Sequence, residues 1–198
     1  MGKWNKYYDL CSQCPSPWVK DAVTRFTGVR RHAVDLGAGT LRHTAYLRQQ
    51  GFLSVIAVDI SPRVHDFAER LGDTNIHARE LDIRDYTPAP GSIDFCVSIN
   101  TLWFIPRKDA LAVIGAVHTG LRDGGFFALN LMGPKDDWVK RGKKGISTFT
   151  REETKLLHPG FEIVHFEENQ KYEPPAGSTV VKLWHQWFIL LRKKGAEH

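Results

Sequence analysis

The sequence predicts an α/β fold, with one doubly wound, mostly parallel sheet and an antiparallel strand near one edge. Two stretches, Ala33–Leu41 and Val55–Ser61, contain apolar runs without polar alternation, which is the pattern of buried parallel strands. Between them, Leu41–Gln50 has a helical pattern and Gly51 follows as a stop signal. The order is strand, glycine turn, helix, strand and acid, which is half of a nucleotide-binding sheet.

Length and composition fit a single domain. The chain has 198 residues, and 42% of them are hydrophobic, which is enough for a core. No apolar run is long enough to cross a membrane, and the start MGKWNKYYDL lacks the apolar part of a signal peptide, so we expect a cytoplasmic protein. The formal charge of +5 permits an anionic substrate or nucleic acid but requires neither.

The cysteines indicate neither a disulfide framework nor a metal site. There are three of them, and an odd number argues against a disulfide scaffold. Cys11 and Cys14 have C-x-x-C spacing, but no second cysteine pair or histidine cluster follows at the spacing of a zinc site. A thioredoxin-like motif would follow a strand, whereas this pair precedes the whole predicted sheet. We therefore expect no metal.

Helices are expected before the first strand as well as between strands. The aromatic residues of Trp4–Leu10 have the spacing of one helical face, and Ser16 precedes a predicted helix over about Pro17–Thr27. After the second strand, Ser61 is expected to cap a helix that has Pro62 at its first position. The other expected elements are a third strand (Asn75–Leu81), a loop (Asp85–Ser92), a fourth strand (Ile93–Ile99), a helix (Arg107–Leu121), a turn (Arg122–Gly125), a fifth strand (Phe126–Met132), a helix from Thr150 to about His158 with a Thr150–Glu153 capping box, and an antiparallel pair (Phe161–Phe166 with Val180–Leu191).

The turn after the first strand has the residues that a nucleotide-like ligand needs. A turn from strand to helix exposes backbone N–H groups at the positive end of the helix dipole, which suits a carboxylate or phosphate. Gly37 and Gly39 let a ligand approach the backbone closely. Asp59, 20 residues after Gly39, lies where an acid binds a ribose diol. The dinucleotide motif would need a glycine at Arg42, so the sequence disfavours NAD.

These residues resemble the first motif of the class I S-adenosylmethionine (SAM) methyltransferases, acid-x-Gly-x-Gly-x-Gly. Asp35, Gly37 and Gly39 match it, and Leu41 stands where the last glycine is usual. The later stretch LRDGGFFALNL is similar to the L-x-x-G-G turn and strand of the same class. The resemblance covers almost the whole chain and looks closest to the small tellurite-resistance and thiopurine-type enzymes. It implies a Rossmann-like sandwich, SAM as cofactor, and methyl transfer to a small-molecule acceptor, possible classes being an anion and a thiol.

The resemblance also implies a set of site residues. An acid after the third strand, here Asp82, commonly meets the adenine amino group while its neighbour Ile83 packs on the ring, and an N-terminal segment often covers the pocket. Ligands bind at the carboxyl ends of strands in open α/β sheets, where Asn100 lies. The residues expected to bind the cofactor are Asp35, Gly37, Ala38, Gly39, Thr40, Asp59, Ile60, Asp82, Ile83 and Asn100. Those expected to contact the acceptor are Tyr8, Trp103, Lys140 and Arg141.

Two stretches bear on the acceptor. Four of the five residues in Lys140–Lys144 are cationic, which usually means solvated surface but would also attract an anionic acceptor. After the fourth strand the chain reads NTLW rather than the Asn/Asp-Pro-Pro-Tyr/Phe of amino-methylating nucleic-acid enzymes, so nucleic acid is not expected as a partner.

The sequence leaves the chemistry partly open. Transfer of a sulfonium methyl group can be driven by positioning and desolvation, so we assign no catalytic base, although His43 is the best candidate. An aminopropyl transferase and a non-catalytic SAM- or RNA-binding protein are the alternatives, and neither the acceptor nor the oligomeric state follows from the sequence. The expected layout is one domain over 1–198, with a helical cap (1–30), a cofactor-binding core (31–132), a basic loop (133–149), and a C-terminal helix with antiparallel strands (150–194).

Overall fold

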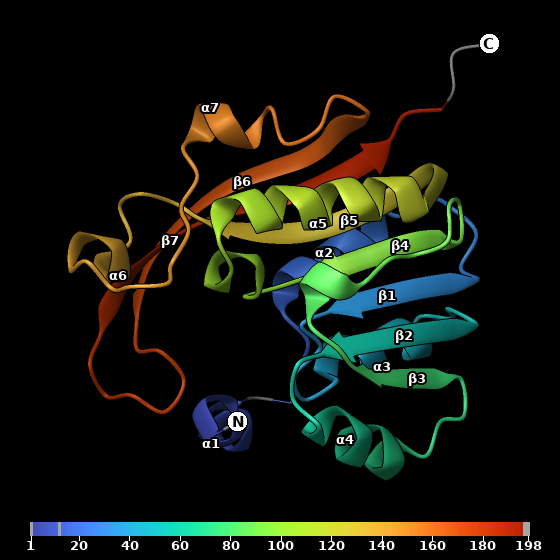
Figure 1. Ribbon diagram of the computed structural model, residues 1–198, viewed down its shortest axis with the longest axis horizontal. Helices are drawn as coiled ribbons and strands as arrows, with labels where there is room; N and C mark the ends of the chain where they lie inside the picture. The colour runs from blue at the N-terminus through green and yellow to red at the C-terminus, as the bar shows by residue number, and fades with distance from the viewer. Residues whose placement is uncertain (1, 12, 196–198) are drawn as a thin grey trace.

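Seven strands form one sheet in the order β3-β2-β1-β4-β5-β7-β6 (Figure 1). The structure is a computed structural model that describes residues 2–11 and 13–195. Strands β1 to β5 pair in parallel, whereas β7 is antiparallel to both of its neighbours, which confirms the predicted sheet. The strands are β1 (His32–Leu36), β2 (Ser54–Asp59), β3 (Ile76–Glu80), β4 (Ile93–Ser98), β5 (Leu121–Met132), β6 (Phe161–Glu173) and β7 (Lys182–Lys193).

Helices cover both faces of this sheet. Figure 1 shows α5 across one face, with α2 and α3 behind the sheet. Neighbouring residues of one strand therefore pack into different cores, as Phe126 and Phe127 of β5 do, which explains the unbroken apolar runs. The helices are α1 (Gly2–Leu10), α2 (Pro17–Arg25), α3 (Arg42–Gln49), α4 (Arg63–Leu71), α5 (Arg107–Gly120), α6 (Asp137–Lys140) and α7 (Arg151–Thr154), with 3-10 turns η1 (Ile83–Asp85) and η2 (Leu102–Phe104).

The glycine that the first motif lacks is replaced by a leucine in a glycine-like conformation. Leu41 precedes α3 with φ 62° and ψ 18°, in the left-handed region. This conformation costs a residue with a side chain about 1–2 kcal/mol. The Leu41 side chain is fully buried beside Tyr8 and Phe67, and burying a leucine contributes about 1.5–3 kcal/mol. Burial thus offsets the strain, and the backbone keeps the path that a glycine would take.

Two helix predictions need correction. The helix after β2 begins at Arg63 with Pro62 as its N-cap, because the Ser61 N–H donates to the Asp59 carboxylate and holds Ser61 outside the helix. The predicted capping box is present, since Thr150 and Glu153 bond reciprocally, but α7 ends at Thr154 rather than near residue 158.

The C-terminal half also differs from the predictions. Residues 122–125, predicted as a turn, belong to β5, which pairs with β4 through a register shift opposite Ile93 and Phe95. The predicted loop after β5 contains α6, which forms because the Asp136 carboxylate accepts a hydrogen bond from the Trp138 N–H and caps it. Strands β6 and β7 form a longer hairpin than expected, with β6 continuing to Glu173.

The strand order reverses between β1 and β4, and ligands of open α/β sheets bind at the carboxyl ends of the strands at such a point. Figure 1 shows α1 and the loop of the β6–β7 hairpin at this end of the sheet. The two are in contact, because a side chain added at Gly177 of the hairpin loop would collide with Leu10 of α1. An ion pair of 2.7 Å between Arg63 and Asp9 ties α1 to α4 as well.

Candidate cofactor site and the adjoining cavity

A cavity of about 240 Å³ lies where the carboxyl ends of β1, β2 and β4 meet α1. All residues predicted to bind the cofactor line it except Asp35, and so does Tyr8. Several further residues line the cavity that were not predicted to do so, and one of them, Thr101, follows the predicted Asn100. The predicted residues that the cavity brings together are Gly37, Ala38, Gly39, Thr40, Asp59, Ile60, Asp82, Ile83 and Asn100, and the further ones include Cys11, Arg84, Ile99, Thr101 and Ile105.

The Asp59 carboxylate joins the parts of this cavity. Its Oδ2 accepts a hydrogen bond of 2.8 Å from the Gly39 N–H, which fixes the glycine turn against the end of β2. Its Oδ1 accepts bonds from the Ser61 N–H (2.9 Å) and the Tyr8 hydroxyl (2.8 Å). A carboxylate offers about four acceptor positions, so a diol would find Oδ2 partly open and Oδ1 already used.

Tyr8 therefore covers the position at which a ribose would meet Asp59. A β-carbon at Gly39 would lie 3.3 Å from the Tyr8 ring, so the ring packs directly on the glycine turn. Burial, together with the Asp59 charge, raises the pKa of Tyr8, so its hydroxyl stays protonated and donates. With α1 in place the cavity is smaller than the roughly 300–1,000 Å³ of typical small-molecule sites. A diol that binds both oxygens of Asp59 requires Tyr8 to give up its bond to Oδ1 or to share it.

Asp82 and Ile83 form a second polar and apolar pair after β3. The Asp82 carboxylate accepts hydrogen bonds from the Arg84 N–H (2.9 Å) and the Arg84 guanidinium (2.6 Å). The Arg84 hydrogen bond lowers the pKa of Asp82, which keeps it ionised as an acceptor. Ile83 is buried beside it. The pair has the arrangement predicted for an adenine contact, a role that remains a prediction.

Asn100 at the end of β4 is held in a strained conformation by a residue that the sequence did not reveal. Its φ of 59° is unusual for a side-chain-bearing residue, and such strain often marks a functional position. The fully buried Asn130 of β5 accepts from the Asn100 N–H at 2.7 Å and donates to its side-chain oxygen at 2.8 Å. The nearby Gly37 has no room for a side chain, which would collide with Thr101.

Two titratable residues next to the cavity are buried. Asp35 is 1% exposed, and its Oδ2 accepts a hydrogen bond of 2.8 Å from the Thr44 hydroxyl while Oδ1 has no hydrogen-bond partner in the described part of the chain. Burial raises the pKa of Asp35 to about 7. His43 lines the cavity, and burial, with the Arg42 charge adding to it, lowers the pKa of His43 to about 3. His43 is therefore a neutral imidazole.

The remaining predicted site residues lie away from this cavity. Asp35 lies beneath the glycine turn and does not line the cavity. Its carboxylate accepts a hydrogen bond from Thr44 and so holds α3 to β1. Trp103 is 1% exposed and packs inside the protein, and its neighbour Phe104 lines the cavity instead. Lys140 and Arg141 line neither this cavity nor the one described next. Arg141 forms an ion pair with Asp137 at 3.7 Å.

A second cavity of about 500 Å³ adjoins the first. Arg42, Ile99 and Asn100 belong to the walls of both, so the two meet at the carboxyl end of β4. The other walls are the start of α2 and one face of the β6–β7 hairpin. These walls comprise Ser16, Pro17, Trp18, Asp21, Glu167, Asn169, Lys171, Glu173, Trp184, Gln186 and Phe188.

Over residues 2–11 and 13–195 no helix combines the length and hydrophobicity that crossing a membrane requires. Within the same ranges no group of three or more His, Cys, Asp or Glu side chains could hold a metal ion. Cys11 and Cys14 are not in a disulfide.

Comparison with known proteins matches the cofactor half of the chain to one family. Residues 33–125 match the family described as a methyltransferase domain. Carboxy-S-adenosyl-L-methionine synthase of Vibrio campbellii is 35% identical over 102 residues, which cover 48% of this chain and 40% of that protein. Methyltransferase tpcM of Aspergillus fumigatus is 34% identical over 122 residues, covering 56% of this chain and 37% of that protein. The match thus spans about two fifths of the length of these relatives.

Solved structures agree on the fold. The crystal structure of TehB from Haemophilus influenzae superposes with a TM-score of 0.72 at 21% identity, over 91% of this chain and 63% of that chain. At this identity the likeness concerns the fold, so the finer resemblance to tellurite-resistance and thiopurine-type enzymes stays a prediction.

The cavity fits the cofactor of this family, S-adenosylmethionine. The buried carboxylate at the end of β2 can accept hydrogen bonds from a diol. The glycines of the turn have no side chains, so a ligand can approach their backbone. An acid with an apolar neighbour follows β3 and lines the same cavity. When bound, the cofactor supplies an activated methyl group on a sulfonium. Residues 33–125 thus match the methyltransferase domain family, and the chain has the fold of the class I S-adenosylmethionine-dependent methyltransferases.

Proposed function

We propose that this protein catalyses methyl transfer from S-adenosylmethionine to a small-molecule acceptor. The observation that carries the proposal is the contact between two cavities at Arg42, Ile99 and Asn100. One cavity has the residues for the cofactor, and the other is open to a second small molecule. A donor and an acceptor placed in them would meet at the end of β4, and such placement can supply much of the barrier reduction.

The chain's own residues favour positioning rather than proton transfer. His43 is the imidazole closest in sequence to the glycine turn, but a group whose pKa is about 3 is a weak base near neutral pH. Asn100, fixed by Asn130, instead presents a rigid polar group at the junction. The chemistry therefore suits an acceptor that already has a free electron pair.

A second candidate function follows from the curated relatives. The protein from Vibrio campbellii is named for making carboxy-S-adenosyl-L-methionine, and it is 35% identical to this chain over 102 residues. A chain with this activity would modify S-adenosylmethionine itself, without an acceptor in the second cavity.

One incubation separates these functions. S-adenosylmethionine carrying a deuterated methyl group is mixed with the protein and with two panels: methyl acceptors (thiols, metalloid oxyanions, amines and nitrogen heterocycles), and carboxylic acids able to give up their carboxyl group, which the second candidate needs as donor. The products are identified by mass spectrometry. We expect S-adenosylhomocysteine together with one deuteromethylated acceptor. A modified S-adenosylmethionine that keeps its labelled carbon on sulfur would support the second candidate, and unreacted cofactor with every member of both panels would contradict both.

A further inference from the structure

We propose that the second cavity binds the methyl acceptor and that this acceptor is an uncharged, planar nitrogen heterocycle. The inference rests on the proposed methyl transfer and names the acceptor class that its site would take. It differs from the sequence-based expectation of an anion or thiol drawn in by Lys140–Lys144.

Aromatic side chains form much of the wall of this cavity. Trp18 lies between two other rings, with centroids 5.2 Å from His165 and 5.4 Å from Phe188. Trp184 and Phe188 line the same cavity from β7. Flat apolar surfaces of this kind favour a planar ring, which stacks on or against them.

Polar groups between these rings suit a ligand with both donor and acceptor atoms. Asn169 and Gln186 line the cavity, and each side-chain amide can donate and accept. The Trp18 indole Nε1 is itself shielded from solvent, so Trp18 presents its apolar ring to the cavity.

The cavity offers an anion little attraction, because the lining cation Lys171 is already paired with an acid of the same wall. Three carboxylates line it, from Asp21, Glu167 and Glu173, against the two cations Arg42 and Lys171. Lys171 is paired with Glu173 at 2.7 Å, and Arg25 outside the lining pairs with Asp21 at 2.7 Å. Glu167 lies 3.9 Å from the His165 ring nitrogen, and its side chain is 54% exposed.

The direction of charge movement gives these acids a role. In the transfer, a nitrogen lone pair bonds to the methyl carbon, the carbon–sulfur bond breaks with its electron pair remaining on sulfur, and the positive charge passes to the acceptor. The new N-methyl cation keeps that charge or releases a nitrogen-bound proton to water. Carboxylates at the acceptor side stabilise a positive charge that appears there, and they repel an acceptor that arrives as an anion.

The cations of the basic loop are used elsewhere. The Lys143 ammonium lies 3.2 Å from the centre of the Trp138 ring, and Arg141 pairs with Asp137. Both contacts lie within residues 133–149, and none of the four cations lines either cavity.

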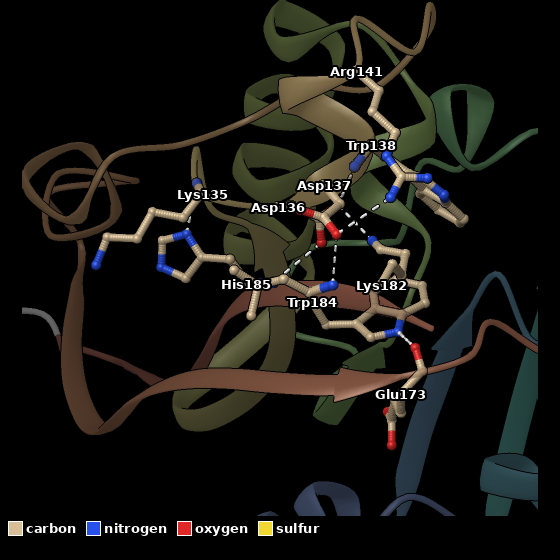
Figure 2. Close-up of polar contacts among 10 residues, drawn as sticks. Lys135, Asp136, Asp137, Trp138, Arg141, Glu173, Lys182, Trp184 and His185 are labelled. Atoms are coloured by element: carbon tan, nitrogen blue, oxygen red, sulfur yellow. Dashed lines mark hydrogen bonds and ion pairs between the residues drawn. The ribbon is translucent and has the colours of Figure 1, made fainter. Parts of the chain in front are cut away.

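Figure 2 shows how the same loop fixes Trp184, the aromatic wall on β7. The Lys182 ammonium lies between two indoles, 3.6 Å from the ring centre of Trp184 and 4.2 Å from that of Trp138. It forms a buried ion pair of 2.5 Å with Asp136, and the Trp184 Nε1–H donates to the Glu173 carbonyl at 3.2 Å. The wall is thus rigid before a ligand arrives, which lowers the entropy lost on binding.

The proposal is tested with pairs of planar nitrogen heterocycles in which one member is uncharged and the other carries a carboxylate. The protein is first titrated with S-adenosylhomocysteine by calorimetry, and the loaded protein is then titrated with nicotinamide or nicotinate, quinoline-3-carboxamide or quinoline-3-carboxylate, and pterin or pterin-6-carboxylate. We expect the uncharged member of at least one pair to bind on the order of tenfold more tightly, because the acids of a partly exposed cavity repel the carboxylate. Glu167→Gln should reduce this preference about threefold, and Glu152→Gln, an exposed acid of α7 outside both cavities, should leave it unchanged.

The outcomes separate a wrong acceptor class from a wrong proposed function. Tighter binding of the carboxylates, equal binding within the pairs, or no binding of either member of any pair would overturn the acceptor assignment while leaving cofactor binding in place. Failure of S-adenosylhomocysteine to bind in the first titration would overturn the proposed function itself. A Glu167→Gln variant with an unaltered preference would also contradict the role of the cavity acids.

Discussion

Replacing Asp59 with alanine is expected to weaken S-adenosylmethionine binding about 10- to 100-fold. The carboxylate is 4% exposed at the end of β2, and hydrogen bonds to a charged group contribute about 1.5–3 kcal/mol. Asp59→Ala also leaves the Gly39 and Ser61 N–H groups without their acceptor, so the free energy of unfolding should fall too. Calorimetry on protein shown to be folded by circular dichroism measures the binding effect. Unchanged affinity in a folded Asp59→Ala protein would count directly against the assignment.

Tyr8→Phe provides the matched control for this experiment. It removes the hydroxyl that occupies Asp59 Oδ1 and keeps the ring that packs on Gly39. If the hydroxyl competes with the cofactor, Tyr8→Phe should bind S-adenosylmethionine at least as tightly as the wild type. A loss comparable to that of Asp59→Ala would show instead that the Tyr8 hydroxyl contributes to the bound state.

The second large effect is expected from Asp35→Asn and depends on pH. Burial raises the pKa of Asp35 from the ordinary 3.8 to about 7, so between these values the folded protein holds a proton that the unfolded chain has lost. The stability contributed by protonated Asp35 is therefore complete below pH 4 and is lost as pH rises toward 7. A difference of about three pKa units corresponds to about 4 kcal/mol. Asparagine cannot ionise, so Asp35→Asn should lack this loss.

The measurement compares the two proteins at several pH values. Urea unfolding of wild type and Asp35→Asn at pH 5, 6, 7 and 8 gives their difference in free energy of unfolding, from which titrations common to both proteins cancel. We expect the difference to shift in favour of Asp35→Asn between pH 5 and 7 and to level off above, because burial raises the pKa of Asp35 and the Thr44 hydrogen bond offsets this rise only in part. A difference that stays constant across this range would show that Asp35 is ionised throughout.

The fold and the cofactor cavity could be predicted because local patterns determine them. Strands buried on both faces read as unbroken apolar runs, and the glycine turn with Asp59 follows from its spacing. Asn130 could not be found in this way, because its role depends on β5 lying beside β4, where its side chain reaches Asn100. Trp103 and Phe104 adjoin in sequence, yet only the geometry of η2 decides that Phe104 faces the cavity.

The second cavity was hardest to predict because distant segments build it. The cavity combines α2, the end of β4 and the β6–β7 hairpin, and no sequence spacing connects these three. The cationic run at Lys140–Lys144 suggested a contact with an anionic acceptor, because charge can be read directly from a sequence. The capping Asp136 and the stacking of Lys143 on Trp138, which place that run elsewhere, depend on tertiary structure.

The central claim is that the cavity over Asp59 binds S-adenosylmethionine and not a dinucleotide. Calorimetric titration of the wild-type protein with S-adenosylmethionine, S-adenosylhomocysteine and NAD tests it most directly. The glycine turn is followed by Arg42, where a dinucleotide site needs a glycine, and Arg42 lines the cavity. We predict binding of both adenosyl compounds with one site per chain and no heat from NAD. Binding of NAD without binding of S-adenosylmethionine would contradict the account.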